Sequence, residues 1–499
     1  MTHDDSRPPA TDHEPAVRDA VRERLFEAAL AEVVTGDPLA EATVDPAASR
    51  PAHALPAAAA LFGVAVALAV WWLRQDDLDR ASQQPAPIPI PIAAEGGAAL
   101  RALDRGTVAI RLEEGMPDDL AVLPEFPQLR YVSMNPRTVR GGQQAWQRAG
   151  LDTLEPLTRC ANLEVLGLPF TAMMSTEHLE LLARCPRLRS FEVRGASLRI
   201  EPDTVAVLAT WPALTRLRLL DAPMSPAGLR ALGTVAGLRE LEFYRCNQLD
   251  DACFEALTSL TNLRLLRITG LGPEPTALPG LPVPSDWQPD ARQLQALHRL
   301  EQLRDLTLLG MTWTKAHVDA LPDALERLSL SSNQVIPSDA IRSMRRFDGL
   351  QQLAFGRVGG DDAQRQRTAR EVADLLGSLR LQTFDWSQQT PPELARAIGS
   401  QPSLRRLDLT WHHGLDLEPM AGLPKLERVT LAARWRAVGE HGQRPRRIVP
   451  APSVLADTLR PLAGCRSLRV VTVFAGSLEQ PARDAMRAAL PERIELRLR

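Results

Sequence analysis

The sequence predicts an α/β solenoid, in which a curved parallel β-sheet lines the concave side and helices line the convex side. Leucine-type residues recur in the spacing L-x-x-L-x-L, as at Leu238, Leu241 and Phe243, and the same spacing returns from Leu263 to Ile268. Between these motifs lies an apolar pattern with helical periodicity, so each unit is a strand, a turn and a helix. A single unit can bury neither face, and stacking of similar units solves this problem.

The repeated motif continues through most of the chain, with a spacing of 22 to 26 residues in most cases. We expect a strand at Val108–Leu112 to open the array and one at Arg493–Leu498 to close it, which gives fifteen strands. At about 4.8 Å per strand, the sheet is on the order of 70 Å long. The first leucines of the motifs between them are Leu129, Leu163, Leu188, Leu214, Leu238, Leu263, Leu303, Leu325, Leu350, Leu381, Leu404, Leu426 and Leu468.

Several of the expected helices have an N-cap residue or a proline at their start. These residues are Ser175, Asp251, Ser338 and Pro391. Because a helix is wider than a strand, the stack must curve with its strands on the inside.

Composition excludes some classes of protein. The chain has 499 residues, more than one ordinary core, with 44% hydrophobic and 24% charged residues. The formal net charge is −3, so we expect no nucleic-acid partner. Nearly all basic residues are arginine, which lowers the weight of any single arginine cluster. Five cysteines form an odd, sparse set rather than a disulfide framework, and they do not settle the redox compartment.

The N-terminal part has three expected segments. Residues 1–53 form an acidic head with eleven Asp or Glu against five Arg, and they contain one short amphipathic helix between partly disordered flanks. This helix could dock a cytoplasmic partner or pack on nothing in particular. Residues 54–73 carry no charge and are long enough to cross a bilayer, with two tryptophans at one end, so they predict a transmembrane helix. A signal peptide and a buried soluble helix are the alternatives.

Residues 74–100 are expected to be a linker, since the run PAPIPIPI favours a stiff polyproline II spacer, although an unspecified tether is equally compatible. Residues 101–499 then form the solenoid. The arginines that flank residues 54–73 do not decide the orientation. By analogy with other single-span bacterial proteins, we expect a single-pass membrane protein whose solenoid is extracytoplasmic.

Cysteines at repeat positions carry a resemblance to a known family. Cys246 is followed by Leu249-Asp250-Asp251, Cys185 by Pro186-Arg187-Leu188, and Cys160 by Ala161-Asn162-Leu163. This stretch resembles the leucine-rich repeat superfamily, specifically the cysteine-containing subtype of F-box-associated and related repeats. The resemblance covers about 400 residues, and it implies protein recognition on the concave sheet or on protruding loops. The head contains no F-box, so an adaptor role in ubiquitin ligases is not implied.

Charged residues on successive strands give the first candidate site. Between the last two leucines of the motif, neighbouring units carry charges of alternating sign, and a second column places Arg216 beside Glu240. Exposed pairs of this kind are worth only about 0.2–1 kcal/mol each. The column could be an internal charge ladder or a stripe that binds a partner. Its candidate partner-binding residues, with Tyr131 on an earlier strand, are Tyr131, Glu192, Arg216, Arg218, Glu240, Glu242 and Arg267.

Two insertions interrupt the period, near residues 271–290 and 434–452. The first contains six prolines and Trp287, and the second contains Arg434, Trp435 and Arg436 among five arginines. Long loops on a rigid scaffold often bind ligands, and an Arg-plus-Trp loop could hold an acidic partner. A tolerated surface insertion is the alternative for each.

No enzyme motif or metal site is expected. His412 and His413 stand near Asp408 and Asp416, but adjacent histidines on a strand point to opposite faces. The chain lacks the G-x-x-x-x-G-K and G-x-S-x-G motifs. We therefore predict no catalytic residues and no cofactor.

The sequence supports a membrane-tethered recognition module, which binds a protein or a surface polymer through its concave sheet and loops. Two alternatives remain: a structural or envelope spacer protein, and a membrane-anchored regulator acting through its N-terminal head.

Overall fold

A computed structural model gives the fold of the chain. The residues that it describes are 90–113, 116–135, 150–168, 174–194, 198–246, 249, 251–271, 288–332, 334–412, 414–433, 451–475 and 478–498.

The strands form one sheet in which every strand runs parallel to the next and the spatial order follows the chain order. Within the described residues this sheet has sixteen strands. They are β1 (Ile92–Glu95), β2 (Ala109–Glu113), β3 (Tyr131–Asn135), β4 (Val165–Gly167), β5 (Ser190–Arg194), β6 (Arg216–Leu220), β7 (Glu240–Tyr244), β8 (Leu265–Thr269), β9 (Asp305–Leu309), β10 (Arg327–Ser332), β11 (Gln352–Val358), β12 (Thr383–Trp386), β13 (Arg406–Trp411), β14 (Arg428–Ala433), β15 (Val470–Phe474) and β16 (Glu495–Leu498).

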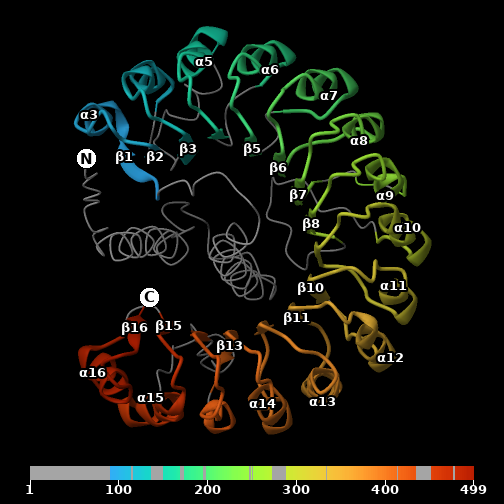
Figure 1. The fold of residues 1–499 in the computed structure, drawn as a ribbon, viewed down its shortest axis with the longest axis vertical. Coiled ribbons are helices and arrows are strands. Elements are labelled where there is room, and N and C mark those ends of the chain that lie inside the picture. The colour runs from blue at the N-terminus through green and yellow to red at the C-terminus, as the bar shows by residue number, and fades with distance from the viewer. Residues whose placement is uncertain are drawn as a thin grey trace, which may run out of the picture.

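The helices lie outside the strands along the whole arc, so the strands form the concave side, as predicted (Figure 1). The α-helices are α3 (Gly96–Arg101), α5 (Leu151–Thr158), α6 (Thr176–Leu182), α7 (Pro202–Ala209), α8 (Pro226–Leu232), α9 (Cys253–Leu257), α10 (Ala291–Gln295), α11 (Lys315–Asp319), α12 (Ser338–Ser343), α13 (Asp362–Leu376), α14 (Pro392–Gly399), α15 (Pro452–Leu459) and α16 (Gln480–Ala488). Short 3-10 helices supplement or replace them: η1 (Pro117–Glu125), η2 (Ala296–Arg299), η3 (Met344–Arg346), η4 (Glu418–Met420) and η5 (Arg460–Gly464).

The curvature is strong enough to make an open ring. In Figure 1, β1 with α3 and β16 with α16 lie on the same side of the view, above and below the opening. The two ends of the repeat array therefore face each other across a gap, although they are about 400 residues apart in sequence.

The motif leucines form the core between the sheet and the helices. Leu238 and Leu241 are fully buried, and Phe243 is buried in the same unit. Helix residues Phe254 and Leu257 close this unit from the convex side. Equivalent residues of all repeats join into one continuous hydrophobic cluster, as expected when stacked units share their interfaces.

One strand lies where the sequence predicts a linker. Ile92–Glu95 forms β1, which pairs with β2 from Ile92↔Ile110 to Glu95↔Glu113. The expected total of fifteen strands is therefore wrong by one. The strand follows a proline-rich run and lacks the leucine motif, so periodicity gave no signal. Gly96 has a φ of +75° and turns the chain from β1 directly into α3.

The predicted helix starts hold to within a residue. Ser175 is the N-cap of α6, and Pro391 is the N-cap of α14, which begins at Pro392. Ser338 is instead the first residue of α12, after Pro337. The N-cap of α9 is Ala252 rather than Asp251. Shifts of this size are usual at helix ends.

The five cysteines are buried free thiols, in line with the expectation that they form no disulfide framework. Several of them also contact the preceding repeat. Cys246 Sγ donates a hydrogen bond to the Leu219 carbonyl at 3.2 Å, and Cys465 Sγ donates to the Met420 carbonyl at 3.0 Å. Cys246 and Cys465 therefore fill space in the core, and each thiol also donates to a backbone carbonyl group of the preceding repeat.

The predicted transmembrane segment, residues 54–73, lies outside the described residues, as do the head and most of the linker. Within the described part, no helix has the length and apolarity that would be needed to cross a bilayer.

Candidate interaction surface

Two rows of side chains run side by side across the concave face of strands β5 to β10. In the first row, Glu192 lies opposite Arg218, Arg218 opposite Glu242, and Glu242 opposite Arg267. The two rows are set by residues two positions apart on each strand, so their side chains share one face of the sheet. The second row consists of Ser190, Arg216, Glu240, Leu265, Asp305 and Arg327.

The charges in these rows form one continuous network. Arg218 bridges Glu192 and Glu242, and its Nε lies 3.3 Å from Glu242 Oε2. Arg216 also contacts two carboxylates, with Nε 3.1 Å from Glu240 Oε2 and Nη2 3.0 Å from Glu242 Oε1. Arg218 therefore links β5, β6 and β7, whereas Arg216 links β6 to β7.

The network continues beyond β8. Arg267 Nη1 lies 4.0 Å from Glu242 Oε1, and Arg267 Nη2 lies 3.3 Å from Asp305 Oδ2. Arg327 Nε lies 3.0 Å from the same Asp305 oxygen. Sequence reasoning missed Asp305 and Arg327. Asp305 and Arg327 occupy the same position of the leucine motif as Arg216 and Glu240. Extending this column of residues past the proline-rich insertion would have predicted both.

The expectation that these charges are exposed is wrong at the centre of the network. Glu242 and Arg267 are each 4% exposed, and Asp305 is 3% exposed. Neighbouring strands bring the long side chains within about 5 Å of one another, and each covers the polar end of the next. The value for surface ion pairs therefore does not apply to Glu242, because removing one partner of a buried pair costs far more.

The arginines determine the charge state of Glu242. Burial by itself would raise the pKa of this carboxyl, but Arg218, Arg216 and Arg267 more than offset it and lower the pKa to about 2. The carboxylate is consequently ionised at neutral pH, and its charge is compensated within the protein.

Glu242 should make stability depend on pH. Its folded-state pKa of about 2 lies below the value of 4.5 that applies to an unperturbed glutamate, so its contribution is complete above about pH 4.5 and is lost as pH falls through 2. We expect the difference in unfolding free energy between the wild-type chain and Glu242→Gln to be about 1 kcal/mol smaller at pH 3.5 than at pH 6.5. Urea titrations of both proteins at the two pH values measure this. A difference that does not change with pH would contradict it.

The remaining predicted site residues divide into two groups. Tyr131 lies on β3, in the same row as Arg216 but beyond the charge network, and it is half-buried. Trp287, Arg434, Trp435 and Arg436 lie outside the described residues. The network thus brings together the predicted charged residues, and the structure leaves the predicted loop residues untested.

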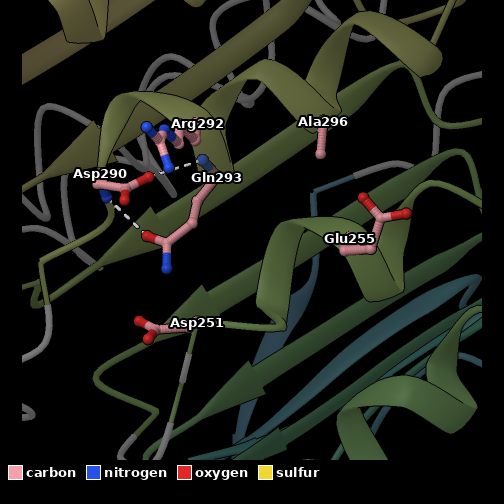
Figure 2. Close-up of a pocket in the computed structure, with 6 residues that line it drawn as sticks. All are labelled: Asp251, Glu255, Asp290, Arg292, Gln293 and Ala296. Carbon is pink, nitrogen blue, oxygen red and sulfur yellow. Dashed lines mark hydrogen bonds between the residues drawn. The ribbon is translucent and has the colours of Figure 1, made fainter.

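A pocket lies on the helical side between α9 and α10, with a volume of about 250 Å³ (Figure 2). Its lining residues are Asp251, Glu255, Asp290, Arg292, Gln293 and Ala296. Asp290 caps α10, where Gln293 N donates to Asp290 Oδ1 at 2.8 Å and Asp290 N donates to Gln293 Oε1 at 2.6 Å. Glu255 contacts Arg299. The carboxylates of Asp290 and Glu255 are therefore engaged in a helix cap and an ion pair of the protein itself.

His412 has a structural contact, since its Nε2 accepts a hydrogen bond from Thr390 N at 3.0 Å. His413 lies outside the described residues. Across the described ranges, His, Cys, Asp and Glu side chains do not gather in groups of three or more that could hold a metal ion.

Comparison with curated proteins shows similarity to a human protein. Podocan-like protein 1 of Homo sapiens is 28% identical over 341 residues, which are 63% of this chain and 61% of the relative. The chain therefore matches less than two thirds of the relative's length. Together with the repeated motif and the sheet, this match supports the leucine-rich repeat superfamily. No family model matches the chain.

Two solved structures also resemble the chain. An internalin from Listeria monocytogenes shows 16% identity and a TM-score of 0.34, over 66% of this chain and 92% of that chain. TLR13, solved in complex with ssRNA13, shows 15% identity and a TM-score of 0.38, over 78% of this chain and 54% of that chain. Scores this low add nothing to the assignment.

Proposed function

We propose that this leucine-rich repeat chain is a non-enzymatic recognition module of the cysteine-containing repeat subtype, which binds a protein or a surface polymer. The observation that carries the proposal is the uninterrupted sixteen-stranded sheet, which presents one continuous concave surface. Solenoids of this type use such extended surfaces for binding. The subtype is supported by Cys160, Cys185 and Cys246, which are buried at their repeat positions.

Membrane tethering through residues 54–73 is part of the proposal, with the solenoid on the outer side of the membrane. It is supported by the uncharged, 20-residue apolar run and the tryptophans at its end. Protease treatment of intact cells that express the chain tests it. We expect the solenoid to be digested while the head stays protected. Protection of the solenoid until the cells are lysed would contradict the outward orientation.

The insertions are the proposed contact loops, together with the concave face. Affinity capture with the full-length chain in detergent tests this role. We expect saturable capture of a partner, which Trp287→Ala combined with Arg434→Ser, Trp435→Ala and Arg436→Ser abolishes without lowering the melting temperature. A control matched in charge replaces the two exposed arginines Arg367 and Arg370 of α13 with serine. Equal capture by the loop variant and the control would contradict the role of the loops.

A second function is favoured by a specific observation. The charge network holds neighbouring strands together and is buried at its centre, as expected for a structural spacer whose charges are internal. If the wild-type chain captures no saturable partner, this spacer function replaces the recognition module.

A further inference from the structure

The residue that follows the first leucine of each motif lies on one rim of the solenoid, where the strands begin. Backbone hydrogen bonds show that these residues are neighbours from repeat to repeat: Arg264 N donates to Arg239 O at 2.8 Å, and Arg304 N donates to Arg264 O at 2.9 Å. From the third strand on, this strand-start rim consists of Arg130, Glu164, Arg189, Thr215, Arg239, Arg264, Arg304, Glu326, Gln351, Gln382, Arg405, Glu427 and Arg469.

Several arginines of the rim contact a glutamate of a neighbouring repeat. Arg130 Nε and Arg189 Nε lie 2.6 Å and 2.9 Å from the two carboxylate oxygens of Glu164. Burial would raise the pKa of Glu164, but these arginines lower it. Arg405 contacts Glu427 in the same way. The prevailing arrangement on this rim is therefore an arginine beside a carboxylate.

Arg239 and Arg264 depart from this arrangement. They are adjacent, both are exposed, and the next residue in the row is Arg304. Among the described residues, neither Arg239 nor Arg264 forms an ion pair. Like charges directly opposite each other on neighbouring strands are destabilising. Arg239 and Arg264 thus carry positive charge that no ion pair among the described residues compensates, and an anion would relieve it.

Arg304 is the last arginine of this run of three, next to Glu326. Its Nη1 donates to the backbone carbonyls of Glu301 and Leu303 at 2.7 Å and 2.9 Å, and its Nε lies 3.9 Å from Glu326 Oε1. These contacts hold the side chain in place at the edge of the group. Within the described part of the chain, the exposed guanidinium groups of Arg239 and Arg264 form no ion pair, so they can donate to a partner.

The short length of the group indicates the class of partner. Thr215 interrupts the positive charge on one side and Glu326 does so on the other, so the run covers three strands, or about 10 Å. A long uniform polyanion would extend past both ends. Two or three carboxylates of one peptide segment fit the run, and the planar guanidinium group pairs with a carboxylate through two parallel hydrogen bonds.

We infer that Arg239, Arg264 and Arg304 form a docking site for a short acidic segment of a partner protein. This site is distinct from the concave network and the insertions, and it rests on the proposed recognition function. Replacing Arg239 and Arg264 with glutamine removes the two exposed charges and leaves the core untouched.

Fluorescence anisotropy of a labelled hexaglutamate peptide tests the site on the full-length chain in detergent at low ionic strength. We expect saturable binding that weakens roughly tenfold in Arg239→Gln/Arg264→Gln, because each lost pair is charge-assisted. The control Arg405→Gln/Arg469→Gln makes the same change of charge on the same rim, and it should keep wild-type affinity. The peptide should also raise the melting temperature of the wild-type chain and of the control, but not that of Arg239→Gln/Arg264→Gln.

Several results would overturn the site. They are the absence of peptide binding, equal losses in the two double variants, and tighter arginine-dependent binding of a sulfated hexasaccharide or of hexathymidylate. The last result would assign the three arginines to another class of polyanion. Because the peptide needs no natural partner, failure of this test is distinguishable from failure of the capture experiment.

Discussion

Glu242→Gln is expected to lower the free energy of unfolding by about 3 kcal/mol at neutral pH. Glutamine keeps the size and much of the hydrogen-bonding capacity of the side chain but removes its charge. Arg216, Arg218 and Arg267 then share a buried site that has lost its central anion. Breaking a buried pair by removing one partner costs about 3–5 kcal/mol. The shift of the Glu242 pKa from 4.5 to about 2 corresponds to a similar energy.

The matched control is Glu240→Gln. Glu240 lies on the same strand, and among the described residues it forms an ion pair with Arg216 alone, at 3.1 Å; it is also partly exposed. We expect its loss to cost no more than about 1 kcal/mol, as for a surface ion pair. Urea unfolding followed by circular dichroism measures both values. Equal losses in the two variants would show that burial at the centre of the network does not control its strength.

Gly228→Ala is expected to destabilise the solenoid by about 3 kcal/mol. Gly228 lies in the first turn of α8, after the N-cap Ser225. A Cβ atom at this position would lie 1.8 Å from the Ile200 carbonyl oxygen, which belongs to the backbone of the preceding repeat. Ser225 N donates to the same carbonyl at 3.2 Å, so Ile200 cannot move without breaking this contact. Overpacking of this kind usually costs about 1–3 kcal/mol, and a clash with backbone lies at the upper end.

Gly422→Ala is the control for this substitution. Gly422 lies in a turn where a Cβ would meet no atom within 4 Å. Alanine should therefore leave stability unchanged or raise it by up to about 1 kcal/mol, because it restricts the unfolded chain. Thermal unfolding of both variants measures the contrast. A melting temperature of Gly228→Ala equal to that of Gly422→Ala would mean that the turn between the two repeats yields easily.

Most of the fold could be predicted from the sequence. The motif at Leu238, Leu241 and Phe243 repeats with its strand, turn and helix, and in each copy the same motif positions are buried. The prediction failed where the motif is absent. Strand β1 has no leucine motif, and it forms because its backbone pairs with the edge of β2.

The candidate surfaces were predictable only in part. Alternating charges on Glu192, Arg218, Glu242 and Arg267 indicated which side chains would meet, since strand neighbours follow from the repeat. Their burial did not follow from it. The exposed fraction of Glu242 depends on side chains from β6 and β8 that lie over it, so it is a property of the assembled sheet.

The sequence alone determined the repeat, the parallel sheet and the identity of its core, because these follow from local spacing that every unit repeats. Tertiary structure decided which charges are buried, which rim arginines face carboxylates and which face other arginines, and where a glycine is required. These properties depend on the register and distance between different repeats. Ile200 and Gly228, or Glu242 and Asp305, influence each other only after the units have stacked.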